Sequence, residues 1–116
     1  MNIEAIREYC VAKPGVTESF PFDQVTLVLK VGNKIFVLLD TESHPTTINL
    51  KCDPERAVQL RDEYSAVQPG YHMNKTHWNT IRVDGTVRGQ ALQEWIDHSY
   101  NLVKKGLPKA VREQLI

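Results

Sequence analysis

The chain has 116 residues, 41% of them hydrophobic and 24% charged, which suits one globular domain spanning residues 1–116. Its 14 basic and 14 acidic residues cancel, and a zero net charge counts against strong non-specific binding to nucleic acid. No apolar run approaches the ~20 residues of a membrane span, and the N-terminus has no signal-peptide core, so we expect a cytoplasmic protein with no membrane contact.

The first predicted element is a helix that begins after the capping residue Asn2. Apolar side chains recur at three- and four-residue spacing from Ile3 to Cys10, and the Pro-Gly pair at residues 14–15 ends the helix. A loop over residues 16–22 is expected to follow.

Three strands are predicted next. Residues 25–31 alternate between apolar and polar side chains, and the Gly-Asn pair at residues 32–33 is typical of a tight hairpin turn. The return strand, residues 34–40, is apolar on both faces, and a polar loop leads from it to a third, alternating strand at residues 46–52.

The second half of the chain begins with a helix, which Asp53 caps and in which Pro54 occupies the first position. Residues 65–73 predict a short strand or extended segment, and residues 77–83 predict a further strand. The last long helix is expected over residues 89–105, with an apolar stripe along one side.

The order of elements is therefore α-β-β-β-α-β-β-α, which predicts an α+β fold. Its helices would pack on one face of an antiparallel sheet and leave the other face open. Alternation places the following side chains on the open face: Thr26, Val28, Lys30, Thr47, Asn49, Lys51, Trp78, Thr80 and Arg82. The strand at residues 34–40 must add apolar side chains there, either Phe36 and Leu38 or Ile35, Val37 and Leu39.

An open face that is part basic, part aromatic and part aliphatic admits three interpretations. Bases can stack on its aromatic side chains while its cations contact phosphates. The same surface suits a homodimer or another protein partner. It also fits an ordinary sheet face that a loop covers or that faces solvent, with Trp78 packed at its edge.

The segment PGYHMNKTHWNT, residues 69–80, is unusual because two histidines and two asparagines crowd into it with a lysine, a tyrosine and a tryptophan. Zinc needs three or four ligands, so His72 and His77 would need Cys52, His44 or His98 to converge on them. Hydrogen bonding within turns explains most of the segment. We therefore expect no metal ion and no cofactor.

Catalytic motifs are not evident. Asp97, His98 and Ser99 are consecutive on a predicted helix, so their side chains point in different directions and do not form a triad. Cys10 and Cys52 fit no CxxC or zinc-ribbon spacing, and we interpret both as reduced, buried thiols. The protein is therefore not expected to be an enzyme.

Five segments of the chain, in order, resemble the MmcQ/YjbR family almost from end to end. They are KPGVTESFPF (13–22), LKVGNKIFVLL (29–39), INLKCDPERAVQLR (48–61), PGYHMNKTHWNTI (69–81) and SYNLVKKGLPK (99–109). The resemblance implies a single two-layer α+β domain of the kind grouped with type III secretion chaperones and compared with the frataxin-like fold. Members are commonly described as DNA-binding proteins with a double-wing motif, and the resemblance supplies no catalytic residues.

The resemblance thus implies DNA as the partner, bound through the basic and aromatic sheet face and the loop at residues 69–80. The lysines and Arg82 would contact phosphate, while Trp78 would stack or wedge between bases. The candidate residues are Lys30, Lys51, His72, Asn74, Lys75, His77, Trp78 and Arg82. The alternative is a protein-interaction or homodimerising module with no nucleic-acid or catalytic activity.

Overall fold

The fold is built around a six-stranded sheet in a computed structural model that describes residues 1–71 and 73–115. Within these ranges, no helix combines the length and the apolar character that crossing a bilayer requires. The elements, in chain order, are α1 (Ile3–Val11), β1 (Val16–Ser19), β2 (Thr26–Val31), β3 (Lys34–Asp40), β4 (Thr46–Lys51), α2 (Pro54–Glu63), β5 (Val67–Pro69), β6 (Trp78–Val83), α3 (Gly89–Lys105) and α4 (Lys109–Glu113).

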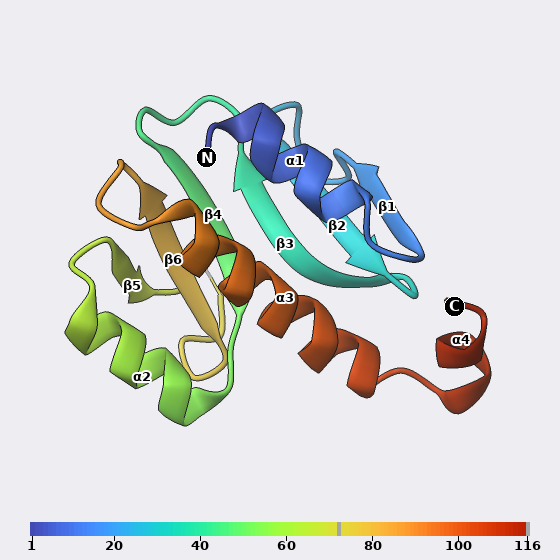
Figure 1. The fold of residues 1–116 in the computed structure, drawn as a ribbon. Helices are drawn as coiled ribbons and strands as arrows, with labels where there is room; N and C mark the ends of the chain where they lie inside the picture. Colours follow the sequence, from blue (N-terminus) through green and yellow to red (C-terminus); the bar gives the residue numbers. More distant parts are fainter. Residues whose placement is uncertain (72, 116) are drawn as a thin grey trace.

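Neighbouring strands run antiparallel throughout the sheet, in the order β1-β2-β3-β4-β6-β5. Helices α1 and α3 lie across one face of the sheet, and α2 lies next to β5 (Figure 1). This arrangement confirms the predicted α+β class, an antiparallel sheet with helices packed on it.

The structure adds two elements that the sequence pattern did not predict. Strand β1 replaces the first part of the loop expected at residues 16–22, and it pairs with β2 from Val16–Val31 to Ser19–Val28. As an edge strand with mostly exposed side chains, it carries no apolar alternation. Helix α4 buries none of its residues, so it too has no apolar pattern that would predict it from the sequence.

The hairpin between β2 and β3 turns at Gly32 and Asn33, whose φ angles of 54° and 67° suit a type I′ turn and confirm the predicted tight turn. Two residues before this turn, the pairing register of β2 with β3 shifts between Leu29 and Lys30. The shift pairs Lys30 with Ile35 and Leu29 with Val37, so the residue between those partners is an extra one, a β-bulge.

The bulge corrects both alternatives for the outward side chains of β3. Phe36, Val37 and Leu39 all belong to the core, whereas Ile35 and Leu38 line the open face. Strict alternation fails here because the extra residue lets two successive side chains point to the same side of the strand. Phe36 is therefore wholly buried and is not available to an open-face partner.

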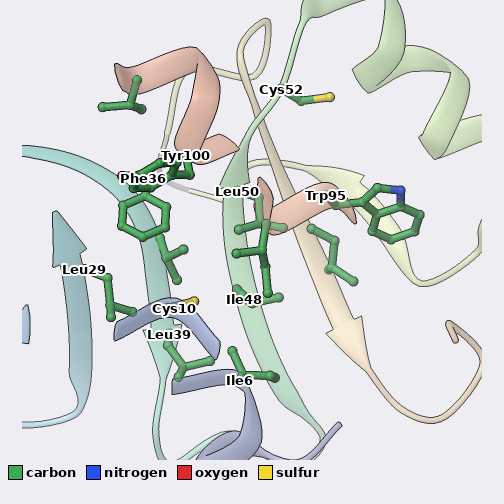
Figure 2. Packing of buried hydrophobic residues seen from close by; sticks show 14 of the residues in the cluster. Ile6, Cys10, Leu29, Phe36, Leu39, Ile48, Leu50, Cys52, Trp95 and Tyr100 are labelled. Atoms are coloured by element: carbon green, nitrogen blue, oxygen red, sulfur yellow. The ribbon is translucent and has the colours of Figure 1, made fainter. Parts of the chain in front are cut away.

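The core fills the space between the sheet and its helices, with Ile6 and Cys10 of α1 and Trp95 of α3 packed on the inner side chains of β2, β3 and β4 (Figure 2). The rings of Phe36 and Tyr100 meet edge to face, with their centres 5.4 Å apart. Both cysteines are free and buried, as predicted.

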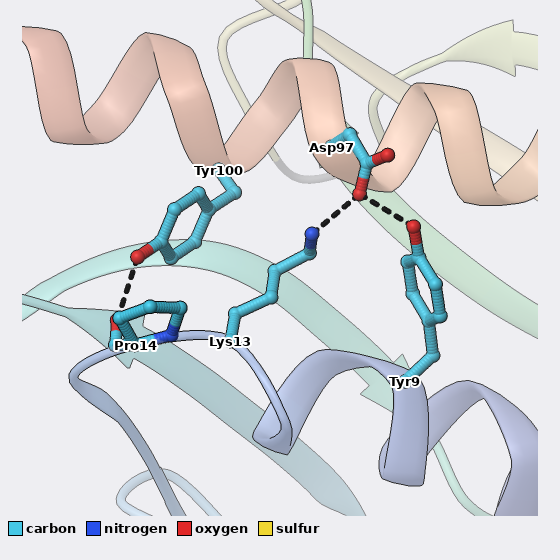
Figure 3. A network of polar contacts seen from close by, with 5 residues as sticks. All are labelled: Tyr9, Lys13, Pro14, Asp97 and Tyr100. Atoms are coloured by element: carbon cyan, nitrogen blue, oxygen red, sulfur yellow. Dashed lines mark hydrogen bonds and ion pairs between the residues drawn. The ribbon is translucent and has the colours of Figure 1, made fainter. Parts of the chain in front are cut away.

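Polar contacts also join α1 and the turn after it to α3 (Figure 3). Asp97 accepts a hydrogen bond from the Tyr9 hydroxyl at 2.7 Å and forms an ion pair with Lys13. The Lys13 Nζ atom lies 4.9 Å from the centre of the Tyr9 ring and 5.2 Å from that of Tyr100. Tyr100 in turn donates to the carbonyl of Pro14 at 2.6 Å. The Lys13 cation therefore contributes to the packing of α1 against α3.

Candidate nucleic-acid interface

Three of the predicted binding residues meet in one groove. Lys30 of β2, Lys51 of β4 and Trp78 of β6 line it, together with Lys34 at the start of β3. The groove has a volume of about 570 Å³, and its other lining residues are Asn33, Ile35, Leu102, Val103 and Gly106. We call it the lysine groove.

The lysine groove lies where β3 and β4 separate. Their ladder ends at the pair of Val37 with Leu50, next to the bulged residue Phe36. Strand β4 continues to pair with β6 as far as Lys51 and Trp78, which lie opposite each other. The last turns of α3 complete the lining from the helix side. The bulge thus opens the sheet at the place where the lysines gather.

A single hydroxyl bridges this separation. Ser99 is 0% exposed, and its Oγ donates to the Phe36 carbonyl at 2.6 Å and accepts from the Lys51 N–H at 2.9 Å. Because buried backbone groups need partners, Ser99 replaces a missing rung of the ladder between β3 and β4. Ser99 is a hydroxyl among the buried, mostly apolar side chains of α3, which is the signal that the sequence offered, but the sequence did not predict this bridge.

Positive charge in the lysine groove is not compensated. The lining contains no acidic side chain. The four ion pairs found within the described ranges use other cations, namely Arg7, Lys13, Arg82 and Lys109. A protein of zero net charge therefore carries a concave site in which three lysines have no anionic partner among the described residues.

Arg82 is not part of this groove. It pairs with Thr47 at the opposite end of the β4–β6 ladder from Lys51 and Trp78. Its guanidinium forms an ion pair with Asp84 at 3.1 Å. Hydrogen bonds from the hydroxyl and N–H of Thr86, aided by Arg82, lower the pKa of Asp84 to about 2, so the pair is charged at neutral pH. Arg82 is thus remote from the lysines and neutralised.

The loop between β5 and β6 holds two candidates that stabilise its own turn. Asn74 accepts hydrogen bonds at 2.9 Å from the Thr76 N–H, through its side chain, and from the Trp78 N–H, through its carbonyl. Lys75 donates to the carbonyl of Gly70 at 3.3 Å. Asn74 and Lys75 therefore fix the loop that leads into Trp78, which agrees with the turn interpretation of this segment.

Of the other candidates in this loop, His77 contributes a backbone contact. The carbonyl of His77 accepts from the Cys52 N–H at 2.7 Å while its side chain is exposed. Arg61, which the sequence did not single out, anchors the loop by donating to the carbonyl of Lys75 and to other groups of β6. His72 lies outside the described residues.

A second groove, of about 630 Å³, crosses the middle of the open face and shares Ile35 with the lysine groove. We call it the central groove. Leu38 and Met73 contribute to its apolar lining, and two of its residues, Phe22 and Tyr71, are 66% and 71% exposed. Its polar lining is uncharged except for Asp40. The central groove therefore lacks the cations that distinguish the lysine groove.

The side chains that resembled a triad turn to three separate places. Asp97 contacts Tyr9 and Lys13 (Figure 3), His98 accepts from the Asp53 N–H at 3.1 Å, and Ser99 bridges the strands. Burial raises the pKa of the Cys10 thiol to about 12 and that of Cys52 to about 11, which leaves both in the unreactive protonated form. In the part of the chain that the structure describes, no cluster of three potential metal ligands is present.

Comparison with known proteins finds relatives along the whole chain. A family model described as YjbR matches residues 11–102. The chain is 33% identical over 116 residues to the uncharacterised protein YjbR of Escherichia coli K12, covering 100% of this chain and 98% of that protein. It is 35% identical over 106 residues to the uncharacterised protein YbdF of Escherichia coli O157:H7, covering 91% and 87%. The crystal structure of Deinococcus radiodurans protein DR2400, with a DUF419 domain, matches with a TM-score of 0.92 at 42% identity, over 98% of this chain and 87% of that one.

Proposed function

The chain belongs to the YjbR family, and on the strength of its lysine groove we propose that it binds nucleic acid in the cytoplasm. The observation that carries the proposal is the meeting of three uncompensated lysines with Trp78 in one concave surface. The free thiols of Cys10 and Cys52 support a reducing compartment.

The chemistry of the lysine groove matches the two parts of a nucleotide strand. Ammonium groups neutralise phosphates and release counterions, which supplies most of the affinity of non-specific binding. An indole ring offers a stacking platform that accepts any base. Trp78 lies directly across the ladder from Lys51, so one nucleotide can contact both side chains. Stacking requires an accessible base, so we propose single-stranded or locally unpaired nucleic acid as the preferred form.

The proposal narrows the set of binding residues. Lys30, Lys51 and Trp78 remain at its centre and Lys34 joins them. The side chains of Lys75 and His77 are exposed in the adjoining loop and are assigned to outer contacts. Arg82 is excluded from the proposed site by its position and by its partner Asp84.

The test is a fluorescence-anisotropy titration of labelled single-stranded and duplex oligonucleotides at low and physiological salt. Lys34→Glu is the decisive variant because Lys34 is exposed beside the hairpin turn, where charge reversal does not threaten the core. We expect it to weaken binding by about tenfold and to reduce the salt slope by about one. Arg82→Glu is the matched charge reversal and is expected to bind almost as the parent protein does. Equal losses in both variants, or no binding at low salt, would contradict the proposal.

The exposed aromatic rings favour a second candidate function, self-association through the central groove. Phe22 and Tyr71 are largely exposed at the central groove beside buried or half-buried Leu38 and Met73, which is typical of a protein interface. A dimer would show twice the monomer mass in light scattering, and Phe22→Glu would return it to a monomer. A monomeric parent protein at high concentration would refute this candidate.

A further inference from the structure

A separate cavity lies on the helix side of the sheet, between α2, α3 and the paired strands β4 and β6. Its volume is about 190 Å³. Six of its ten lining residues are buried, and they form its inner wall: Leu50, Cys52, Leu60, Asn79, Ile81 and Trp95. In Figure 2 the Cys52 sulfur and the Trp95 indole project to the same side of β4. The cavity is thus a recess in the core and does not belong to the open face.

The cavity opens to solvent at its mouth, where Arg56 and Glu94 are exposed, and its volume is large enough for a small ligand. An engineered cavity of about 150 Å³ lined by Leu, Ile and Phe stays dry and binds benzene. The present cavity is larger, and Leu50, Leu60 and Ile81 give it a similar aliphatic wall. It can therefore accommodate an apolar group of about six carbon atoms.

The mouth of the cavity is polar. Arg56 and Glu94 are exposed there and His98 is half-buried, while Lys51, whose backbone N–H bonds to Ser99 on this side of the sheet, is the remaining lining residue. Because the Nε2 atom of His98 accepts the hydrogen bond from the Asp53 N–H, neutral His98 carries its proton on Nδ1, where it is a donor. Burial lowers the pKa of His98, and Arg56 lies close enough to lower it further, whereas Asp53 raises it. A guanidinium and a neutral donor therefore adjoin at the mouth, and these two groups suit a carboxylate.

We propose that this cavity binds a small carboxylate whose ring or branched aliphatic body packs against Trp95 and Leu60 while its carboxylate contacts Arg56 and His98. Arg56 and His98 select the carboxylate, and the aliphatic wall selects the apolar body. Small compounds of this size bind proteins with dissociation constants of about micromolar to millimolar. The assignment is independent of nucleic-acid binding, although Lys51 lines both the cavity and the lysine groove.

Benzoate is the probe that tests the assignment, with benzylamine and benzamide as its cationic and neutral counterparts. The chain has two tryptophans, so a Trp78→Phe background leaves Trp95 as the sole indole fluorophore at the cavity wall. We expect benzoate to change Trp95 fluorescence saturably, to raise the melting temperature, and to bind at least about tenfold more tightly than benzylamine. The absence of a saturable change, or equal binding of the amine, would overturn the assignment.

Two variants test the two halves of the site. Leu60→Phe fills part of the cavity and is expected to abolish benzoate binding. Arg56→Gln changes an exposed side chain, so it preserves the fold, and it is expected to weaken benzoate by about tenfold without affecting benzamide. Lys105→Gln, an exposed charge at the far end of α3, is the control and should bind as the parent does. If Leu60→Phe fails to fold, Arg56→Gln decides, and unchanged benzoate affinity in that variant would overturn the assignment.

Discussion

The two ends of the β4–β6 ladder each present a cation to the open face, yet they differ in what surrounds it. At one end Lys51 lies opposite Trp78, and the adjacent strand β3 has separated from β4 at its bulge. At the other end Arg82 lies opposite Thr47 and is paired with Asp84. We call them the groove end and the Arg82 end. Alternation thus predicts which face of the sheet a cation occupies, while the availability of that cation for binding depends on neighbours outside the strand.

The two ends also differ in which groups form the hydrogen bonds of the backbone between β3 and β4. At the Arg82 end the ladder between β3 and β4 is regular up to the pair of Asp40 with Thr47. At the groove end the ladder stops, and the Ser99 hydroxyl supplies the missing contacts. The groove end therefore depends on a helix for its shape, and the Arg82 end depends on the sheet itself.

The largest expected effect comes from removing that hydroxyl. Ser99→Ala removes the hydroxyl that pairs with the buried Phe36 carbonyl and with the half-buried Lys51 N–H. A buried unsatisfied group costs about 1–3 kcal/mol and a half-buried one less, so we expect a loss of about 2–4 kcal/mol in the free energy of unfolding. Urea denaturation followed by circular dichroism measures it. Asn101→Ala, an exposed change on the same helix, should stay within about 0.5 kcal/mol. A similar result for both variants would show that the bridge does not stabilise the groove end.

The next effect concerns the stacking platform of the groove end. Trp78→Ala is expected to weaken single-stranded nucleic-acid binding by about 1–3 kcal/mol, which is the range found for a base stacked on an aromatic side chain. Trp78→Phe retains a ring and should recover most of the affinity. Anisotropy titrations with a single-stranded oligonucleotide measure both. If Trp78→Phe and Trp78→Ala bind equally weakly, the indole does not act by stacking, and the groove end binds through its lysines alone.

Local signals predicted most of the fold. The Gly-Asn turn, the Asn2 and Asp53 caps and the long helix at residues 89–105 each depend on a few neighbouring residues, and each is found close to its predicted place. Strand β1 and the bulge at Phe36 depend on pairing with another strand, which leaves no periodic trace in the strand itself. Strict alternation therefore kept Phe36 as one of two alternatives for the open face, although it lies in the core.

The candidate site was half predictable for the same reason. Alternation placed Lys30, Lys51 and Trp78 on one face, and the fold brings them together. It missed Lys34, which lies beside a turn and outside any alternating pattern of polar side chains. It retained Arg82, although Asp84 lies only two residues further along the chain and neutralises it. The convergence of three strands and the end of α3 into one groove follows from the tertiary arrangement, which no local pattern contains.

A smaller effect is expected from freeing the Arg82 cation of its partner. Asp84→Asn removes the carboxylate that pairs with Arg82, so the Arg82 end should then carry positive charge of its own. Because exposed ion pairs contribute about 0–1 kcal/mol, we expect nucleic-acid affinity to rise by less than about fivefold. The anisotropy titration used for the groove variants detects this gain. The combined Asp84→Asn and Arg82→Gln variant, which has no cation to free, should show none. A gain as large as the loss in Lys34→Glu would mean that the two ends are equivalent.

The smallest effect separates the two ends by pH. Burial, together with the charge of Arg56, lowers the pKa of His98 below its ordinary 6.5, although Asp53 opposes the shift. The unfolded chain therefore binds this proton more readily, so the stabilising contribution of His98 is complete above pH 6.5 and is lost as the pH falls below it. Asp84, whose pKa is lowered from 3.8 to about 2, loses its contribution only as the pH falls below 3.8. Acid should therefore weaken the contact between His98 and Asp53 before it weakens the Arg82 end. Asp53 lies two residues after Lys51, beside the groove end.

Urea unfolding at a series of pH values measures both steps. His98→Gln offers a side-chain oxygen that can accept the same hydrogen bond without titrating, so it should remove the first step and leave the second. A first step that persists in His98→Gln would assign it to another group.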